Sequence, residues 1–498
     1  MASVMRGAGE VHPTAAWCDT SEGAAICRLP HPGGGTRMSL VIHTTTIVTC
    51  DDAGTVHHGV SIAIRDDRIA AIGPDEEVAR AFPDAERIDG RNRAVFPGFA
   101  NIHTHLGMTL ARGLYEDLSP PHKPPFSGGL SPLPLPKLSA EEYAVMCQLG
   151  ALEAIRCGTT ALLEDGTNIA GYAAQMVDTG LRMLLAERTW DRANASIGDP
   201  GPFEQDDRLG EAGLERIADL HAKWHGAGQG RIRVGLAAWA PDMCSPGLLR
   251  RVRALQEELD TVATIHLNQI WGEVAAVQAH RGMLPTEYLA SLDVLNPRLI
   301  CAHCRCMDHR EERLLGRARV SVSFNSAIAA RRGLSPRVAV LEQEGCTIGM
   351  GSDNMAEDMV EVTRTGLFME RIRREDGRNP TPEQALRWAT RNGYQAMGLD
   401  DAGFLAPGCK ADLIIVRTDR PHLTPMIRAV STFVHQGQPH DVESVMVDGA
   451  WLMRDGVVRT IDEAAIVKEA DRIARRAWGE LFAAKPELRI LPGIPPAF

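Results

Sequence analysis

The middle of the chain alternates short apolar runs with amphipathic stretches, and turn-forming residues separate the two patterns. The apolar runs have strand length, and the polar–apolar spacing between them is typical of helices. The predicted strands are residues 95–106, 159–164, 181–190, 232–241, 262–267, 298–303, 320–325 and 347–353. The predicted helices include residues 139–157, 248–259, 309–317 and 336–344, and a further capped helix at Thr381. Eight strands with interleaved helices over about 300 residues predict an α/β fold, the (β/α)8 TIM barrel.

Both ends of this region are flanked by short β-like segments rich in β-branched residues and bounded by Asp, Gly and Pro. They are residues 40–49, 60–64 and 68–72 on one side, and 411–416 and 444–453 on the other. We therefore expect one small β-sandwich domain built from both segments, with the barrel inserted between them. The expected parts are residues 1–37 as a disordered or loosely ordered extension, 38–95 with 403–460 as the β-sandwich domain, 96–402 as the metal-dependent catalytic barrel, and 461–498 as a C-terminal helix and tail.

The proline-rich stretch 119–137 has no periodicity and cannot form a helix. A loop of this length inside a compact domain is often functional, so we expect it to lie over the mouth of the barrel. The alternative is a passive surface connection.

Composition limits the possible partners. The 498 residues are 44% hydrophobic and 23% charged, as in ordinary globular proteins, and no apolar run is long enough for a membrane span. The net charge of -11 without a basic stripe argues against nucleic acid and favours a small-molecule partner. The 11 cysteines are spread singly, as in a reduced intracellular protein, so we expect a cytoplasmic location. We also expect a homo-oligomer, a dimer or larger.

Several predicted strands end in residues that bind metals. His103 and His105 leave the same face of the first barrel strand, and His266, His303 and Asp353 end three later strands. Taken singly, each could be a buried polar group or a helix cap, but five at the carboxyl ends of barrel strands predict a metal centre. Three imidazoles and a carboxylate can hold one divalent ion and leave a position for water, whose pKa falls to about 7.

These residues suggest catalytic and binding roles. Asp353 can bind the metal and accept the proton of the attacking water, and His303 can donate a hydrogen bond to the substrate or to the forming oxyanion. Arg112 is a candidate for gripping an anionic or carbonyl group of the substrate, with a surface ion pair as the alternative. Trp271 is a candidate for lining a pocket for a flat ring, with core packing as the alternative.

The segment Pro97-Gly-Phe-Ala-Asn-Ile-His-Thr-His105, with His266, Ala302-His303-Cys304 and Gly351-Ser-Asp353, resembles the amidohydrolase superfamily. The nearest branch is that of triazine hydrolases, guanine deaminase and S-adenosylhomocysteine deaminase, and the resemblance spans about residues 38–460. It implies a single divalent ion, usually zinc or iron with zinc favoured here. The ligands that it implies are His103, His105, His266 and Asp353, and His303 would contact substrate or water.

One position departs from this resemblance. The family deaminases carry a glutamate proton shuttle three residues after the strand-five histidine, where this chain has Gln269. An amide cannot relay a proton near neutral pH, so another acid must protonate an amine leaving group. Candidates are Glu273, one helical turn beyond Gln269, and Glu164 at the end of the second strand. For Glu273 the alternative is a solvated helix carboxylate.

The sequence therefore predicts a metal-dependent hydrolase of non-peptide carbon–nitrogen bonds in a small heterocyclic or amide-like substrate. The predicted reaction is attack by metal-bound hydroxide, with an aminohydrolase, that is a deaminase, as the favoured activity. The same centre would also serve an amide, carbamate or urea hydrolase, or a hydrolytic dehalogenase whose leaving group needs no proton. A catalytically silent scaffold with this fold is the remaining alternative.

Overall fold

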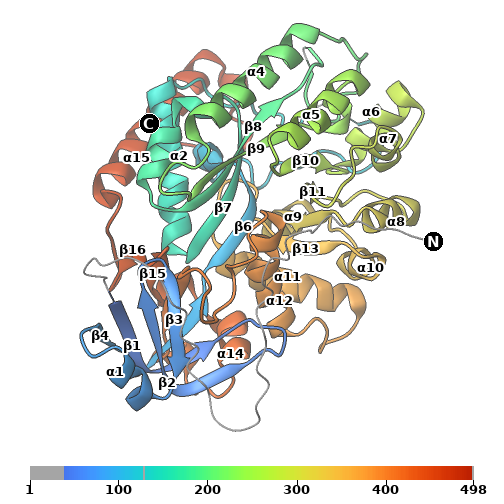
Figure 1. Cartoon of the computed structure of the whole chain (residues 1–498). Coiled ribbons are helices and arrows are strands. Elements are labelled where there is room, and N and C mark those ends of the chain that lie inside the picture. Colours follow the sequence, from blue (N-terminus) through green and yellow to red (C-terminus); the bar gives the residue numbers. More distant parts are fainter. Residues whose placement is uncertain (1–38, 127–128, 194, 496–498) are drawn as a thin grey trace, which may run out of the picture.

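The structure is a computed structural model that describes residues 39–126, 129–193 and 195–495 (Figure 1). Its centre is a closed barrel of eight parallel strands, which confirms the predicted fold. The barrel strands are β6 (Phe99–Thr104), β7 (Thr159–Gly166), β8 (Arg182–Thr189), β9 (Ile232–Ala238), β10 (Ala263–Leu267), β11 (Leu299–His303), β12 (Ser321–Phe324) and β13 (Thr347–Met350). The extension expected at residues 1–37 lies outside the described residues.

Helices follow the barrel strands and surround the barrel (Figure 1). They are α2 (Ala140–Arg156), α3 (Ala173–Asp178), α4 (Asp207–Trp224), α5 (Pro246–Glu258), α6 (Trp271–Arg281), α7 (Pro285–Ser291), α8 (His309–Arg317), α9 (Ser326–Arg332), α10 (Val338–Glu344), α11 (Met359–Arg374), α12 (Pro382–Ala389) and α13 (Arg391–Ala396). The predicted capping box starts α2, where the Ser139 side chain accepts from the Glu142 N–H and the Glu142 side chain accepts from the Ser139 N–H.

The segments at both ends of the described chain form one mixed nine-stranded sheet, as expected of a β domain built from both. Its strands are β1 (Ser39–Val48), β2 (Val56–Arg65), β3 (Arg68–Gly73), β4 (Glu86–Asp89), β5 (Arg93–Pro97), β14 (Leu413–Arg417), β15 (Val442–Val447), β16 (Ala450–Arg454) and β17 (Val457–Val458). The antiparallel pair of β5 with β14 joins the two segments. The helices α1 (Asp75–Ala81) and α14 (Ala429–Gln436) flank this sheet in Figure 1.

The β-like segment 444–453 forms a hairpin. Strands β15 and β16 are joined there by a turn at Asp448 and Gly449. Both turn residues have positive φ, 48° and 74°, as a tight hairpin turn requires.

A buried ion network joins the barrel to the sheet. The guanidinium of Arg182, at the start of β8, donates to both carboxylate oxygens of Asp412 over 2.8 and 3.1 Å and to Asp448 over 2.6 Å. The Tyr394 hydroxyl donates to Asp412 as well. Since the side chains of Arg182 and Asp412 are 4% and 0% exposed, the network fixes the sheet against the amino-terminal end of the barrel.

The helix α15 (Glu463–Ala484) packs beside α2 on the outside of the barrel (Figure 1). The Trp478 indole N–H of α15 donates to the carbonyl of Leu110, which lies in the short 3-10 segment after β6. Among the described residues, no helix combines the length and apolar character needed to span a membrane.

Candidate metal centre

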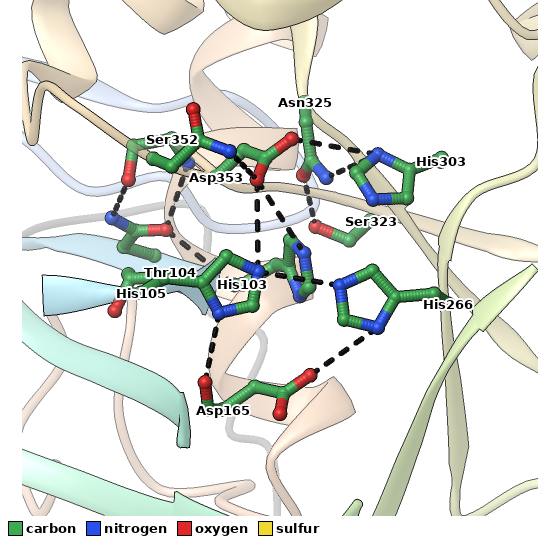
Figure 2. A network of polar contacts seen from close by, with 12 residues as sticks. His103, Thr104, His105, Asp165, His266, His303, Ser323, Asn325, Ser352 and Asp353 are labelled. Atoms are coloured by element: carbon green, nitrogen blue, oxygen red, sulfur yellow. Dashed lines mark hydrogen bonds and ion pairs between the residues drawn. The ribbon is translucent and has the colours of Figure 1, made fainter. Parts of the chain in front are cut away.

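Four predicted ligands converge at the carboxyl end of the barrel, and Figure 2 shows them pointing toward one another. His103 lies on β6, His105 precedes the 3-10 helix η1 (Leu106–Ala111), His266 lies on β10 and Asp353 follows β13. The His105 Nε2 is 3.2 Å from the His266 Nε2 and 3.7 Å from Asp353 Oδ1. The His103 Nε2 is 4.0 Å from the same carboxylate oxygen. Each of these three pairs of atoms is close enough for both to bind one ion.

The hydrogen bonds of two imidazoles identify their tautomers. The His105 Nδ1 is 2.8 Å from the Asp165 carbonyl, and the His266 Nδ1 is 2.9 Å from the Trp239 carbonyl. A carbonyl only accepts, so each Nδ1 carries the proton. The Arg188 guanidinium is farther from the His105 Nδ1, at 3.4 Å, and does not change this assignment.

With both rings neutral, each Nε2 carries a lone pair, and the two Nε2 atoms lie 3.2 Å apart. Neither ring nitrogen of the buried His103 has a hydrogen-bond partner among the described residues. Burial lowers the pKa of His103 and of His266 well below the ordinary value, so both imidazoles are neutral. A cation between these nitrogens relieves the lone-pair repulsion, and a histidine whose other nitrogen donates to a carbonyl is the usual metal ligand.

Asp165 at the end of β7 is a site residue that the sequence reasoning missed. One carboxylate oxygen lies 3.5 Å from the His266 Nδ1 and has no hydrogen-bond partner among the described residues, while the other accepts from Arg188. One potential ligand atom from each of His103, His105, Asp165 and His266 lies within 4.8 Å of the others. The same holds for a second group, which is His103, His303 and Asp353.

The alternation of side chains along β7 could have identified Asp165 from the sequence. Ala161 and Leu163 pack inside the barrel, so Asp165 shares their face. Glu164 faces the other way, and its carboxylate accepts from Thr104, the Leu106 N–H and Tyr172. Glu164 therefore fills a structural position, and the structure does not bring this candidate acid into the metal centre.

His303 at the end of β11 has the opposite tautomer. Its Nδ1 lies 2.9 Å from a guanidinium nitrogen of Arg305 and 3.0 Å from the Asn325 amide nitrogen. A guanidinium only donates, so Nδ1 accepts and Nε2 carries the proton. Burial, with the Arg305 charge next in effect, lowers the pKa of His303 well below its usual value, so the ring is neutral. His303 thus carries an N–H donor at Nε2, which is buried and has no partner among the described residues.

The backbone holds Asp353 in a strained position. Its N–H donates to the His103 carbonyl and its carbonyl accepts from the His105 N–H, which ties the end of β13 to β6. His303 and Asp353 both have positive φ, 79° and 73°, which residues other than glycine rarely adopt. Such strain concentrates at functional sites. Below Asp353, Asn101 donates to Ser352 and Glu357 in a buried network.

The metal centre opens into a cavity of about 590 Å³. His105, Asp165, His266 and Asp353 lie in its wall, and the rest includes aromatic and aliphatic side chains such as Tyr143, Tyr172, Trp239 and Leu138. The proline-rich segment contributes Leu130, Leu135 and Pro136, so the described part of this loop does cover the mouth of the barrel. The cavity size and its apolar lining suit a small, flat ligand.

Gln269, three residues beyond His266, lines this cavity, and its Oε1 is buried without a partner among the described residues. Glu273 does not line it. The two Glu273 carboxylate oxygens accept from the backbone N–H groups of Asn268 and Gln269 over 2.8 and 2.7 Å. Glu273 is fully buried rather than solvated, and its contacts position the loop that carries Gln269.

Two of the three predicted substrate contacts, Arg112 and Trp271, do not reach the cavity. The Arg112 guanidinium donates to the Met355 carbonyl and to Glu153, in agreement with the ion-pair alternative. Trp271 is 38% exposed and is not part of the cavity wall. Both lie close to the barrel end in sequence, but neither side chain faces the metal centre.

Comparison with known proteins identifies the class. Residues 94–452 match the profile described as the amidohydrolase family, and residues 62–85 match that of an imidazolonepropionase-like composite domain of bacteria. The chain therefore belongs to the amidohydrolase family. This membership confirms the prediction of a metal-dependent hydrolase of carbon–nitrogen bonds other than peptide bonds.

Particular relatives are deaminases by name. The chain is 33% identical over 438 residues to 5'-deoxyadenosine deaminase of Methanothermobacter thermautotrophicus, which covers 86% of the chain and 97% of the relative. It is 30% identical over 447 residues to 5-methylthioadenosine/S-adenosylhomocysteine deaminase of Pelotomaculum thermopropionicum, covering 88% and 98%.

Solved structures share the fold. An adenosine deaminase from Xanthomonas campestris with bound zinc has a TM-score of 0.77 at 24% identity and covers 89% of this chain and 99% of its own. A triazine hydrolase variant also has a TM-score of 0.77, at 18% identity, covering 88% and 99%.

Proposed function

We propose that this protein is a hydrolytic deaminase of a small heterocyclic amine, with one divalent ion per chain. Zinc is the first candidate and iron the second, because neutral imidazoles and a carboxylate suit both ions. The observation that carries the proposal is the pair of Nε2 lone pairs of His105 and His266, which face each other over 3.2 Å at the wall of the cavity.

The residues that would hold the ion are His103, His105, His266 and Asp353, with Asp165 as a further candidate. When bound, the ion supplies a nucleophile near neutral pH by lowering the pKa of a water molecule. Asp165 and the Trp239 carbonyl orient His266, and the Asp165 carbonyl orients His105. These contacts fix the Nε2 lone pairs before any ligand arrives.

In the proposed reaction Asp353 transfers the proton, and His303 stabilises the charge that develops on the substrate. The Asp353 carboxylate accepts a proton from the attacking water, and burial raises its pKa, which favours the protonated form that then returns the proton to the leaving amine. The His303 Nε2–H donates to the heterocycle as charge develops on it. Because Gln269 cannot relay a proton, Asp353 performs both transfers in this chain.

Adenosine derivatives are the first compounds to test, because the named relatives are deaminases of 5'-deoxyadenosine and of 5-methylthioadenosine and S-adenosylhomocysteine. The cavity of about 590 Å³ has room for a compound of that size, and Tyr143 and Trp239 offer aromatic faces.

Gln269 favours a second candidate function. Displacement of a halide at the same centre needs no proton on the leaving group. Hydrolysis of an amide, carbamate or urea, whose amine leaving group does need a proton, is the other alternative at this centre. The scaffold alternative is not retained, because the chain belongs to a family of hydrolases and keeps the histidine–aspartate cluster.

Ammonia release tests the proposal. Zinc-loaded and iron-loaded protein is incubated with adenosine derivatives, aminopurines, aminopyrimidines, pterins and aminotriazines, and in parallel with amides, ureas and chlorotriazines. The proposal predicts ammonia from at least one ring amine. Turnover confined to amides, ureas or chlorinated rings would replace it with the second function.

We also propose a cytoplasmic location and assembly into a dimer or larger oligomer. The location is supported by the nine cysteines that the structure describes, which are all free and buried. Assembly stays a prediction, and light scattering of the purified protein tests it.

A further inference from the structure

A second, smaller chamber adjoins the metal centre on the side of β11 and α9. Gln269, Asp353 and Asn354 line both this chamber and the main cavity, so the two spaces meet at these residues. The far side of the chamber contains Arg305 and Arg332. We propose that these two arginines form a subsite for a carboxylate that the substrate carries close to its reacting carbon.

Arg305 is held in place but not neutralised. It follows β11 by two residues, and its side chain is only 2% exposed. One guanidinium nitrogen donates to the His303 Nδ1 and lies 3.7 Å from Asp353 Oδ2, while its Nε is buried without a partner among the described residues. Burial lowers the pKa of Arg305 to about 10, so the group stays cationic at neutral pH.

Arg332 has even fewer partners. It ends α9, is 8% exposed, and its guanidinium makes no hydrogen bond or ion pair with the described residues. Its Nη1 is buried without a partner. Asp353 and Glu116 act on it only through space. A buried guanidinium without an acceptor is costly, so a retained one indicates a ligand that supplies the acceptor.

The charges at the chamber do not balance. Two guanidiniums face one carboxylate, Asp353, and in the proposed function that carboxylate also serves the divalent ion. Glu116 lies in the neighbourhood of Arg332, but one of its carboxylate oxygens is itself buried without a partner and does not reach the guanidinium. An anionic group of the substrate would complete this arrangement with charge-assisted hydrogen bonds.

The same arrangement gives a reason for Gln269. This residue stands between the main cavity and the chamber, at the position where the family deaminases carry a glutamate. A glutamate there would pair with the arginines or repel an incoming carboxylate. The neutral amide does neither, and its terminal group can donate a hydrogen bond to an anionic oxygen.

The size of the chamber limits the group that can enter it. Its volume is about 20 Å³, compared with about 590 Å³ for the main cavity. A small polar group fits such a space and a ring does not. The planar carboxylate is a small anion that matches the fork of donors that a guanidinium presents.

This inference rests on the proposed function and narrows its substrate class. The ring occupies the main cavity with its amine-bearing carbon at the metal centre, and a carboxylate on the adjacent ring atom enters the chamber. Simple adenosine derivatives lack such a group. The substrate would then differ from those of the named relatives by one negative charge beside the reacting carbon.

A matched pair of ring compounds tests the subsite without turnover. Calorimetry measures the dissociation constants of pyrimidine-5-carboxylate and of its neutral 5-carboxamide, neither of which has a ring amine to release, for zinc-loaded protein. The proteins compared are the wild type, Arg332→Gln, Arg332→Lys and Arg331→Gln. The control Arg331 sits on the same helix but pairs with Glu361 outside the chamber. Any contact of the probes with zinc is common to all four proteins.

The wild type and Arg331→Gln should bind the acid at least about tenfold more tightly than the amide, as expected for hydrogen bonds to a charged group. Arg332→Gln should lose this preference, and Arg332→Lys should keep part of it. Equal binding of acid and amide by the wild type, no binding of either, or a preference that survives in Arg332→Gln would each overturn the subsite. Thermal melting and zinc content verify that each variant is folded and loaded.

Ammonia release separates this inference from the proposed function. Deamination of neutral rings, with no preference for the acid in binding, would reject the carboxylate subsite and support the deaminase function. An Arg332-dependent preference without ammonia from any ring amine would confirm the subsite and reject the deaminase.

Discussion

Replacing Asp353 by Asn should abolish catalysis while leaving the fold in place. The carboxylate lies 3.7 Å from the His105 Nε2 and 4.0 Å from the His103 Nε2, and its side chain is 2% exposed. Asparagine has the same size, and its carbonyl oxygen can still accept the hydrogen bond that the Asn354 amide donates over 2.9 Å. What is lost is the negative charge among the metal ligands and the site that accepts a proton.

Loss of a general base alone lowers kcat by about 100-fold to 10,000-fold, and loss of the anionic ligand adds to it. We therefore expect kcat to fall by at least about 1,000-fold, which corresponds to about 4 kcal/mol. The assay is steady-state ammonia release by zinc-loaded protein, with zinc content measured on the same sample.

A matched control is Asp358→Asn. Asp358 caps α11 by accepting from the Val360 and Glu361 N–H groups, and Asn caps a helix equally well. This variant should keep the wild-type kcat. A zinc-loaded Asp353→Asn enzyme with kcat within tenfold of wild type would refute the role assigned to Asp353.

Three further predictions concern other residues. Gln269→Glu should raise kcat/KM for neutral ring amines, measured by steady-state kinetics, and lower the affinity for the 5-carboxylate probe, measured by calorimetry. An unchanged preference between acid and amide would contradict the role of Gln269. Burial raises the pKa of Asp358 to about 6 from 3.8, so the folded state binds its proton more tightly than the unfolded chain does, and wild-type stability should fall as pH rises through this window. Asp358→Asn has no such titrating group, so its free energy of unfolding relative to wild type, measured with denaturant, should increase by about 1–3 kcal/mol from pH 4 to 7. A difference that does not depend on pH would be inconsistent with the raised pKa of Asp358. Arg182→Met leaves the buried Asp412 carboxylate without its cation and should destabilise the fold by about 3–5 kcal/mol. Arg208→Met breaks an exposed pair with Asp206 of similar geometry and should have a much smaller effect; equal losses would show that burial is not the deciding factor.

The fold was predictable because its signal is local. Each barrel strand lies in a short segment rich in apolar residues between turn-forming or polar residues, so all eight were located from the sequence. The five candidate groups on or just after β6, β10, β11 and β13 followed from the rule that parallel strands bring their carboxyl ends together. The hairpin of β15 and β16 has a local signal too, since Asp448-Gly449 is a strong turn dipeptide.

The remaining residues depend on direction and on long-range packing. Glu164 and Asp165 are neighbours, and strand parity alone decides which of them faces the metal centre. Trp271 and Glu273 share a helix that starts near His266, yet one side chain points to solvent and the other binds backbone N–H groups. Arg305 and Arg332 come from different elements, and only the folded barrel brings them to one chamber.

The central claim is that His103, His105, His266 and Asp353 bind one ion. Its most direct test is the zinc affinity of the purified protein, measured by competition with a chelator, for wild type, His266→Asn and the control His435→Asn, whose ring lies on α14. The account predicts about one zinc per wild-type or control chain and at least about 100-fold weaker binding by His266→Asn. A folded wild-type protein that binds no zinc, or a His266→Asn variant that binds it as tightly as wild type, would contradict the account.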